Sequence, residues 1–277
     1  MAISAQDVNK LRQMTGAGMM DCKQALNEAN GDFEEAITIL RKKGQKISAK
    51  RADREATEGA VFAFVTETGS EGYIFALNCE TDFVAKNEEF LGLGNTILKT
   101  AVANKPESKE ELLTLDVDGN TVADHITNFT GKIGEKIEVS AYAKVNAEKI
   151  AIYIHSNAKV GVILGLDGVG SHDVSELGKD ITLQIASMKP VAIDKDGVDP
   201  AIIEREIEIG KEQARQEGKP ENILEKIALG KLNKFYQDST LLNQQFVKDN
   251  SKTIAQLIKE VSADIKVSVF HRMEIGA

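Results

Sequence analysis

The sequence EGAVFAFVTETGSEGYIFALNCETDFVAKNEEF, residues 58–90, contains the clearest structural pattern of the chain. Residues 58–67 and 72–80 are rich in Val, Ile, Phe and Tyr, and the glycine-bearing segment TGSEG joins them. This pattern predicts a β-hairpin. A helix is predicted next, because apolar or small residues recur at helical spacing at Phe90, Leu93, Gly94, Ile97, Leu98 and Ala101.

The same order of predicted elements recurs around residues 149–188. KIAIYIH and KVGVILGLDG predict two strands after EKIEVSAYAKV, and the helix SHDVSELGKDITLQIASM stops at Pro190. Sequence identity between the units at 60–103 and 149–188 is weak, so we interpret them as a similarity of architecture. IKVSVFHRMEI, near the C-terminus, alternates like a strand that can lie at a sheet edge. The fold class predicted is α+β, with a two-part core of antiparallel strands and flanking helices.

The N-terminal residues predict three short helices. Ser4 with Asp7, and Asp32 with Glu35, have the spacing of helix-capping pairs, and the glycines of TGAGMMD interrupt the helical pattern between them. Two apolar stripes can close a small core, one at Cys22, Ala25, Leu26 and Ala29 and one at Phe33, Ala36, Ile37 and Leu40. The chain therefore divides into a helical module (1–45), a basic linker (46–57), two core parts (58–146 and 147–199), a helical hairpin (200–238) and a C-terminal module with a returning strand (239–277).

A basic run follows the helical module. RKKGQKISAKRADR, residues 41–54, contains seven basic residues and one acidic residue, whereas the whole chain has a net charge of −9. Such a run can contact nucleic acid or an acidic protein surface. Composition alone favours a solvated, mobile linker. The acidic remainder argues against a protein whose main task is to bind nucleic acid.

Met20 is a candidate contact residue in the helical module. At about 100° per residue, Met20 lies opposite the stripe that contains Cys22, among Lys23 and other polar residues, while Met19 lies at its flank. An exposed Met beside a glycine-rich turn can form a deformable contact surface. It can also be a single apolar residue on the surface, which is common.

Residues 200–238 predict two helices joined by Gly-Lys-Pro, because Pro200 suits a first helical turn. Both helices are thinly apolar, so the hairpin either projects as an interaction arm or packs as a satellite bundle on the core. SKTIAQLIKEVSAD then predicts a further amphipathic helix. Residues 105–135 show only acidic helical pieces and glycines.

Composition excludes several classes of protein. The 277 residues are 42% hydrophobic and 28% charged, which is ordinary for a globular protein, and no apolar run is long enough to span a membrane. MAISAQDVNKLRQMTG lacks the pattern of a secretory signal, and two cysteines give no disulfide framework, so we expect a cytoplasmic protein. The four histidines lack metal-site spacing, no nucleotide-binding loop is complete, and Cys22 lies in an apolar stripe. We expect no enzyme, no metal site and no cofactor.

The segment NCETDFVAKNEEF, residues 78–90, contains the strongest functional candidate. Asp82 and Phe83 lie side by side where the hairpin ends. One interpretation is structural: Asp82 caps the next helix, and Phe83, seven residues before Phe90, belongs to its buried stripe. The other is functional, with an exposed acid and aromatic ring presented to a partner, a composition typical of binding hot spots.

TGAGMMDCKQALNEANGDFEEAI (15–37) and CETDFVAKNEEF (79–90) closely resemble bacterial translation elongation factor Ts, the guanine-nucleotide exchange factor of elongation factor Tu. The order of parts is similar over essentially the whole chain: a ubiquitin-associated-like (UBA-like) module, a two-part core, a coiled-coil hairpin and a C-terminal module in which FVKDNSKTIAQLIKE (246–260) resembles the family. The partner implied is elongation factor Tu, in its GDP-bound and nucleotide-free states, with no membrane and no direct nucleic-acid binding expected.

The resemblance also implies roles for single residues. Asp82 and Phe83 match the family pair that enters the nucleotide domain of elongation factor Tu near its Mg²⁺ site, and Thr81 and Val84 complete that motif. His155 matches the family histidine that contacts the partner alongside this ring. The module's contact with the same domain is matched by Met19, Met20 and Lys23. The implied activity is displacement of Mg²⁺ and release of GDP, with GTP releasing the factor. The competing hypothesis is an adaptor that binds protein or RNA through the module and the coiled-coil arm without driving exchange.

Overall fold

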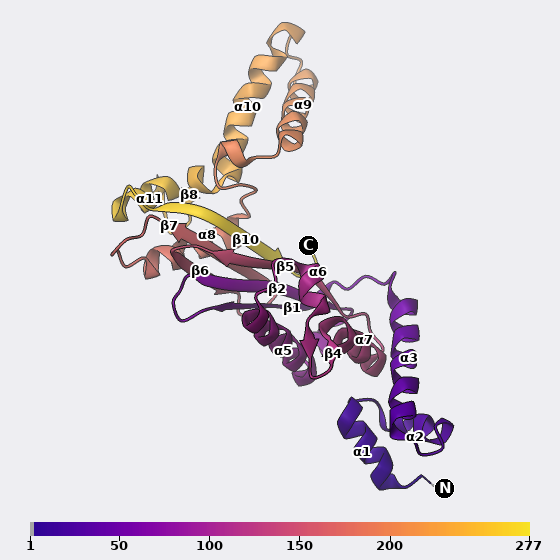
Figure 1. Cartoon of the computed structure of the whole chain (residues 1–277). Coiled ribbons are helices and arrows are strands. Elements are labelled where there is room, and N and C mark those ends of the chain that lie inside the picture. The colour runs from indigo at the N-terminus through magenta and orange to yellow at the C-terminus, as the bar shows by residue number, and fades with distance from the viewer. Residues whose placement is uncertain (1–2) are drawn as a thin grey trace.

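The computed structural model describes residues 3–277 and shows an α+β molecule (Figure 1). A central body of two sheets and their helices lies between an N-terminal helical module on one side and a projecting helical hairpin on the other. The predicted fold class is therefore confirmed.

The first sheet has the strand order β1-β2-β5 and contains the predicted hairpin. β1 (Glu58–Val65) pairs antiparallel with β2 (Glu71–Cys79), and β5 (Glu138–Asn146) pairs antiparallel with the other edge of β2. Between β2 and β5 the chain forms α4 (Asp82–Ala85), α5 (Glu88–Asn104), α6 (Lys109–Thr114), the short ribbon β3 (Asp116–Val117) and β4 (Asn120–Thr121), and α7 (Val122–Ile133). Apolar side chains of these helices and of the sheet form one hydrophobic cluster, centred on Phe75, Phe90 and Ile97.

The second sheet repeats this plan. β6 (Lys149–Ile154) and β7 (Val160–Asp167) form an antiparallel hairpin, α8 (Ser175–Met188) follows, and β10 (Lys266–Glu274) pairs antiparallel with β7. The strand order is β10-β7-β6, so β10 is an edge strand as predicted. In both sheets the second strand of a hairpin is central and a later strand completes the sheet, which confirms the predicted similarity of architecture.

The two sheets pack face to face through small and branched side chains. Val61, Ile74 and Ala76 of the first sheet meet Ile163 and Met273 of the second. Glycine permits this close approach, since a Cβ on Gly161 would lie 2.4 Å from a methyl carbon of Val61. The body therefore has four layers: helices, sheet, sheet and helices.

The N-terminal module consists of α1 (Ala5–Thr15), α2 (Met19–Glu28) and α3 (Phe33–Arg51). Ser4 and Asp7 form the predicted capping box, Asp32 caps α3, and Cys22 is buried. The prediction of a basic linker over residues 46–57 is wrong for residues 46–51, because α3 continues to Arg51; only residues 52–57 connect α3 to β1. Lys, Gln, Arg and Ala are good helix formers, and basic residues in the last turn interact favourably with the helix dipole.

The predicted helical hairpin is formed by α9 (Pro200–Gln216) and α10 (Leu224–Ser239), and it projects from the body (Figure 1). This outcome favours the projecting arm over the satellite bundle. Asp199 caps α9, directly before Pro200. The chain then forms β8 (Gln245–Phe246), β9 (Asp249–Thr253) and α11 (Ile254–Val261), which packs with α8 in the hydrophobic cluster behind the second sheet. Three short 3₁₀ turns span Lys195–Gly197, Glu221–Ile223 and Leu241–Asn243.

Candidate protein-interaction site

The chain turns sharply between β2 and α4, and we call residues Thr81–Val84 the 81–84 corner. β2 ends at Cys79, and Thr81 is the N-cap of α4, with its Oγ1 accepting a hydrogen bond from the Val84 N–H. Thr81, not Asp82, is therefore the capping residue, so the interpretation of Asp82 as a helix cap is wrong. Asp82 is the first residue of α4.

Phe83 and Val84 point to opposite environments although they are neighbours. The Phe83 side chain is 83% exposed, whereas Val84 is 7% exposed and packs into the cluster behind the first sheet. The interpretation of Phe83 as part of the buried stripe is also wrong. α4 ends at Ala85 and α5 begins at Glu88, so Phe83 and the buried Phe90 belong to different helices and the seven-residue spacing does not place them on one face.

Two glutamates fix the corner to the chain segment before β5. The Glu135 carboxylate accepts hydrogen bonds from the Thr81 N–H (3.0 Å) and the Thr81 hydroxyl (2.7 Å). The Glu80 carboxylate accepts a hydrogen bond from the Lys136 N–H (2.7 Å) and pairs with the Arg51 guanidinium (2.9 Å). Four charge-assisted contacts therefore hold Glu80 and Thr81, the two residues directly before α4, and such contacts are stronger than neutral hydrogen bonds.

Asp82 has an ionic partner of its own. Its carboxylate accepts a hydrogen bond from Lys86 Nζ at 2.7 Å, one helical turn later, and the Asp82 side chain is 49% exposed. The hydrogen bond and charge of Lys86, with a smaller effect of Lys159, hold the pKa of Asp82 below its ordinary value. Asp82 is therefore an anionic, solvent-accessible group beside the exposed ring.

The turn that carries His155 lies at the same end of β1 as the corner. The Val61 N–H donates to the Ala158 carbonyl (2.7 Å), and Lys159 pairs with Glu58 (2.6 Å), the residue opposite Cys79 in the β1–β2 register. His155 is exposed, and its Nδ1 is 2.7 Å from the Tyr153 hydroxyl. The structure thus brings this predicted site residue to the neighbourhood of the corner.

Met19, Met20 and Lys23 lie on α2, in the N-terminal module, and all three are exposed. Met20 is 73% exposed and Met19 is 55% exposed, whereas Cys22 on the opposite face is fully buried. The helical-wheel prediction for Met20 is therefore confirmed. These residues form a second surface, which we call the α2 face.

The described residues contain no group of three or more His, Cys, Asp or Glu side chains arranged to hold a metal ion. Within residues 3–277, no helix combines the length and the apolar character that a membrane crossing requires. Both cysteines are buried, and burial raises the pKa of the Cys79 thiol to about 12, so it is no thiolate nucleophile.

Comparison with known proteins agrees with this arrangement. The family model of elongation factor Ts matches residues 80–277. Elongation factor Ts of Cytophaga hutchinsonii is 57% identical over 275 residues, covering 99% of each chain. The proteins of the same name from Amoebophilus asiaticus and Porphyromonas gingivalis are 52% and 48% identical, covering 100% of each chain. The chain belongs to the elongation factor Ts family. The family match begins at Glu80, directly before the corner, and the full-length relatives extend the similarity through the N-terminal module.

Three residues that support the corner were not predicted from the sequence. Glu135 lies in the segment where no motif was recognised, and its partner Thr81 is 54 residues away. Arg51 belongs to the run that was interpreted as a linker, and Glu80 directly precedes the motif. Of the three, only Glu80 could have been recognised from the sequence, as an acidic residue at the end of a predicted strand.

Proposed function

We propose that this chain is the guanine-nucleotide exchange factor of elongation factor Tu in translation elongation, and that the 81–84 corner promotes GDP release. Family membership supports this role. The observation that carries the mechanism is the exposure of Phe83, at 83%, on a corner held rigidly by Glu80 and Glu135. A large aromatic ring costs free energy when it is left in water, and this ring has an anionic neighbour in Asp82.

The mechanism follows from the coordination chemistry of the partner's metal ion. Mg²⁺ requires near-ideal octahedral geometry from waters, carboxylates and phosphates, so a small displacement of a supporting element weakens its binding. Phe83 inserts between helices of the partner's nucleotide domain, and the Asp82 carboxylate disturbs groups that hold the water shell of the ion. Loss of Mg²⁺ leaves phosphate charge uncompensated, and GDP leaves. The factor needs no cofactor of its own, because it acts on the Mg²⁺ and GDP of the partner.

Release of the factor follows from linkage. If binding of this chain weakens nucleotide binding by a given factor, nucleotide binding weakens the affinity for this chain by the same factor. Incoming GTP therefore dissociates the complex. Thr81 and Val84 position the corner, His155 adds a contact beside it, and Met19, Met20 and Lys23 contact the same domain of the partner from the α2 face. The partner is bound in its GDP-bound and nucleotide-free states, without direct contact to nucleic acid.

The test is the rate of GDP release from elongation factor Tu, measured by stopped flow with fluorescent GDP. Phe83→Ala should change the free energy of unfolding by less than about 0.5 kcal/mol, because the ring is exposed. It should slow the stimulated release at least about tenfold, as expected for a hot-spot residue. Phe64→Ala is the matched control, since Phe64 is also exposed, at 40%, but lies within β1. It should leave the rate unchanged.

Two results would contradict the proposal. An unfolded Phe83→Ala variant would assign the ring a structural role. A wild-type chain that binds elongation factor Tu without changing the release rate would support the adaptor hypothesis, for which the projecting α9–α10 hairpin is the favouring observation.

A further inference from the structure

The N-terminal module docks on the body where α3 crosses α7, and two glycines face each other at this crossing. A Cβ on Gly131 would lie 2.7 Å from the Gly44 Cα, and a Cβ on Gly44 would lie 3.4 Å from the Thr127 carbonyl oxygen. Gly44 is buried although it is in the middle of a basic, otherwise exposed stretch of α3. Glycine within a helix costs about 1 kcal/mol relative to alanine, so two facing glycines are explained here by the close backbone approach.

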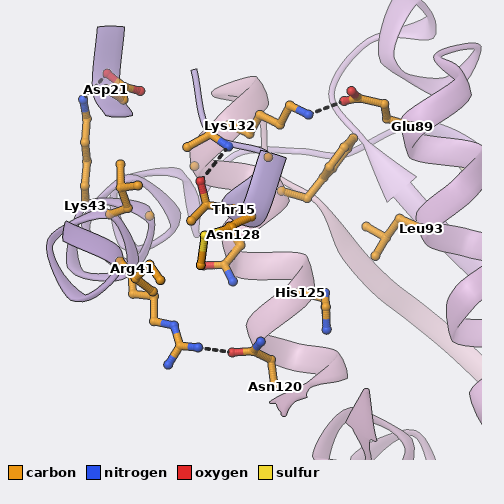
Figure 2. A pocket seen from close by; sticks show the side chains of 18 of the residues that line it. Thr15, Asp21, Arg41, Lys43, Glu89, Leu93, Asn120, His125, Asn128 and Lys132 are labelled. Atoms are coloured by element: carbon orange, nitrogen blue, oxygen red, sulfur yellow. Dashed lines mark hydrogen bonds and ion pairs between the residues drawn. The ribbon is translucent and has the colours of Figure 1, made fainter. Parts of the chain in front are cut away.

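Polar contacts surround the crossing, as Figure 2 shows. The Arg41 guanidinium of α3 donates to the side-chain oxygen of Asn120, in β4, two residues before α7 begins. Lys132, next to Gly131, pairs with Glu89 of α5 at 2.6 Å, and its Nζ lies 3.6 Å from the Cβ position of Gly16, in the turn between α1 and α2. The module therefore contacts the body both through α3 and through the turn that precedes the α2 face.

The space beside the crossing is otherwise open. A cavity of about 590 Å³ lies between the module and α5 and α7, with Leu40, Leu93 and Phe129 among its lining residues. The two parts thus meet mainly along the α3–α7 crossing, and their hydrophobic clusters share no residue. Their relative position depends on how closely the two backbones approach.

The C-terminal end of α3 contacts the residue that precedes the 81–84 corner. Arg51, in its last turn, pairs with Glu80 at 2.9 Å, and Glu80 precedes the capping residue Thr81. One helix therefore links the module that carries Met19 and Met20 to Glu80, which lies directly before the 81–84 corner that carries Phe83.

We propose that the Gly44–Gly131 crossing is a rigid joint that sets the α2 face at a fixed position relative to the 81–84 corner, so that both surfaces bind one molecule of the partner together. This inference rests on the proposed function. When two surfaces of one protein engage one partner, binding of the first raises the effective concentration of the second, and this gain is lost if the geometry forbids simultaneous contact. Gly44 and Gly131 are positioning residues, since neither is on the α2 face or at the corner.

The first measurement concerns the full-length chain without its partner. Nitroxide labels on Asn27→Cys in α2 and Glu110→Cys in α6 report the distance between module and body by double electron–electron resonance; the native Cys22 and Cys79 are fully buried. Gly131→Leu should broaden or shift the distance distribution. Gly44→Leu, on the opposite side of the contact, should have the same effect. Gly92→Leu is the matched control, because a Cβ at this helical glycine has no atom within 4 Å, and it should leave the distribution unchanged.

The second measurement is affinity for elongation factor Tu by titration calorimetry. Gly131→Leu should weaken binding at least about tenfold, as expected for loss of simultaneous contact. In a Met20→Ala background the same substitution should weaken binding by a smaller factor, since the contact that the joint positions is already impaired. An unchanged distance distribution in both glycine variants would overturn the proposal of a joint. Additive effects of Gly131→Leu and Met20→Ala on the free energy of binding would overturn it as well. A wild-type chain that fails to accelerate GDP release would overturn the proposed function and leave the distance result standing.

Discussion

Thr81 makes the contacts that hold the exposed Phe83 in place. Its N–H and hydroxyl group donate to Glu135, and its Oγ1 accepts from the Val84 N–H at 3.5 Å, a long hydrogen bond. The hydroxyl group thus caps α4 and also bonds to the segment before β5. Phe83 itself contributes little to stability, so the orientation of its ring depends on these contacts of its neighbours.

Replacement of Thr81 tests this dependence. Thr81→Ala should reduce the free energy of unfolding by about 1–2 kcal/mol, because the cap is lost and Glu135 loses one donor. Chemical denaturation measures this change, and the rate of GDP release from elongation factor Tu should fall as well. Thr81→Ser, which keeps the hydroxyl group, should restore most of both. Equal behaviour of the Ala and Ser variants would show that the hydroxyl group is irrelevant to the corner.

For single residues, helical spacing in the sequence predicted burial correctly in some cases and not in others. Helical spacing correctly predicted that Met20 is exposed and Cys22 buried, because both lie on one continuous helix. It could not decide between the two interpretations of Phe83, because the break between α4 and α5 removes the periodicity on which the argument depends. The role of Glu135 could not be predicted, for a different reason. Its contact with Thr81 joins residues that are distant in the sequence and leaves no local sequence pattern.

At the scale of single elements, strands and amphipathic helices followed from local patterns, whereas the extent of α3 did not. A basic run favours solvation in any conformation, so composition does not distinguish a linker from a helix. α3 is stabilised there by partners in other elements, namely α7 at Gly44 and Glu80 at Arg51. β10 is intermediate: its alternation predicted an edge strand, but its pairing with β7, about 100 residues earlier in the chain, was not visible in any local pattern.

β10 is tied to α8 by a small ionic cluster. The Glu274 carboxylate pairs with Arg272 on its own strand and with Lys189 at the end of α8, each at 2.8 Å, and Arg272 also donates to the Ala186 carbonyl. Hydrogen bonds from Arg272 and Lys189 lower the pKa of Glu274 to about 2. Because the pKa is lower in the folded chain than the ordinary 4.5, the cluster stabilises the fold above that value, and the contribution is lost as the pH falls toward 2.

Glu274→Gln should therefore lower stability at neutral pH and have progressively less effect in acid. We expect a loss of about 1 kcal/mol at pH 7, or about 2–4 °C in the thermal midpoint. The difference from the wild type should shrink between pH 4.5 and pH 2. Thermal unfolding followed by circular dichroism at several pH values measures it. Glu204→Gln, an exposed carboxylate on α9, is the control and should show no such pH dependence. A difference that is constant with pH would mean that the charge of Glu274 is not the stabilising feature.

For the whole molecule, the hydrophobic clusters show which parts can fold by themselves. The cluster of the N-terminal module contains only residues between Ile3 and Leu40, with Leu11, Cys22 and Leu26 at its centre. The clusters behind each sheet and between the sheets contain no residue of the module. The body should therefore not need the module in order to fold, whereas the α2 face is available only with the module.

Deletion of residues 1–54 tests this separation. The remaining chain keeps Ala56, whose carbonyl accepts from the Asn78 side chain at 2.9 Å. It loses the α3–α7 crossing, the pair between Arg51 and Glu80, and the polar contacts of the module with Asn120 and Lys132. It should unfold cooperatively, with a thermal midpoint within a few degrees of the full-length value, because surface contacts of this kind contribute little. Its affinity for elongation factor Tu should fall at least about tenfold, since Met20 and Lys23 are gone. At saturating concentration it should still accelerate GDP release, because Phe83 remains. Unchanged affinity would remove the α2 face from the mechanism, whereas loss of cooperative unfolding would show that the body needs the docked module.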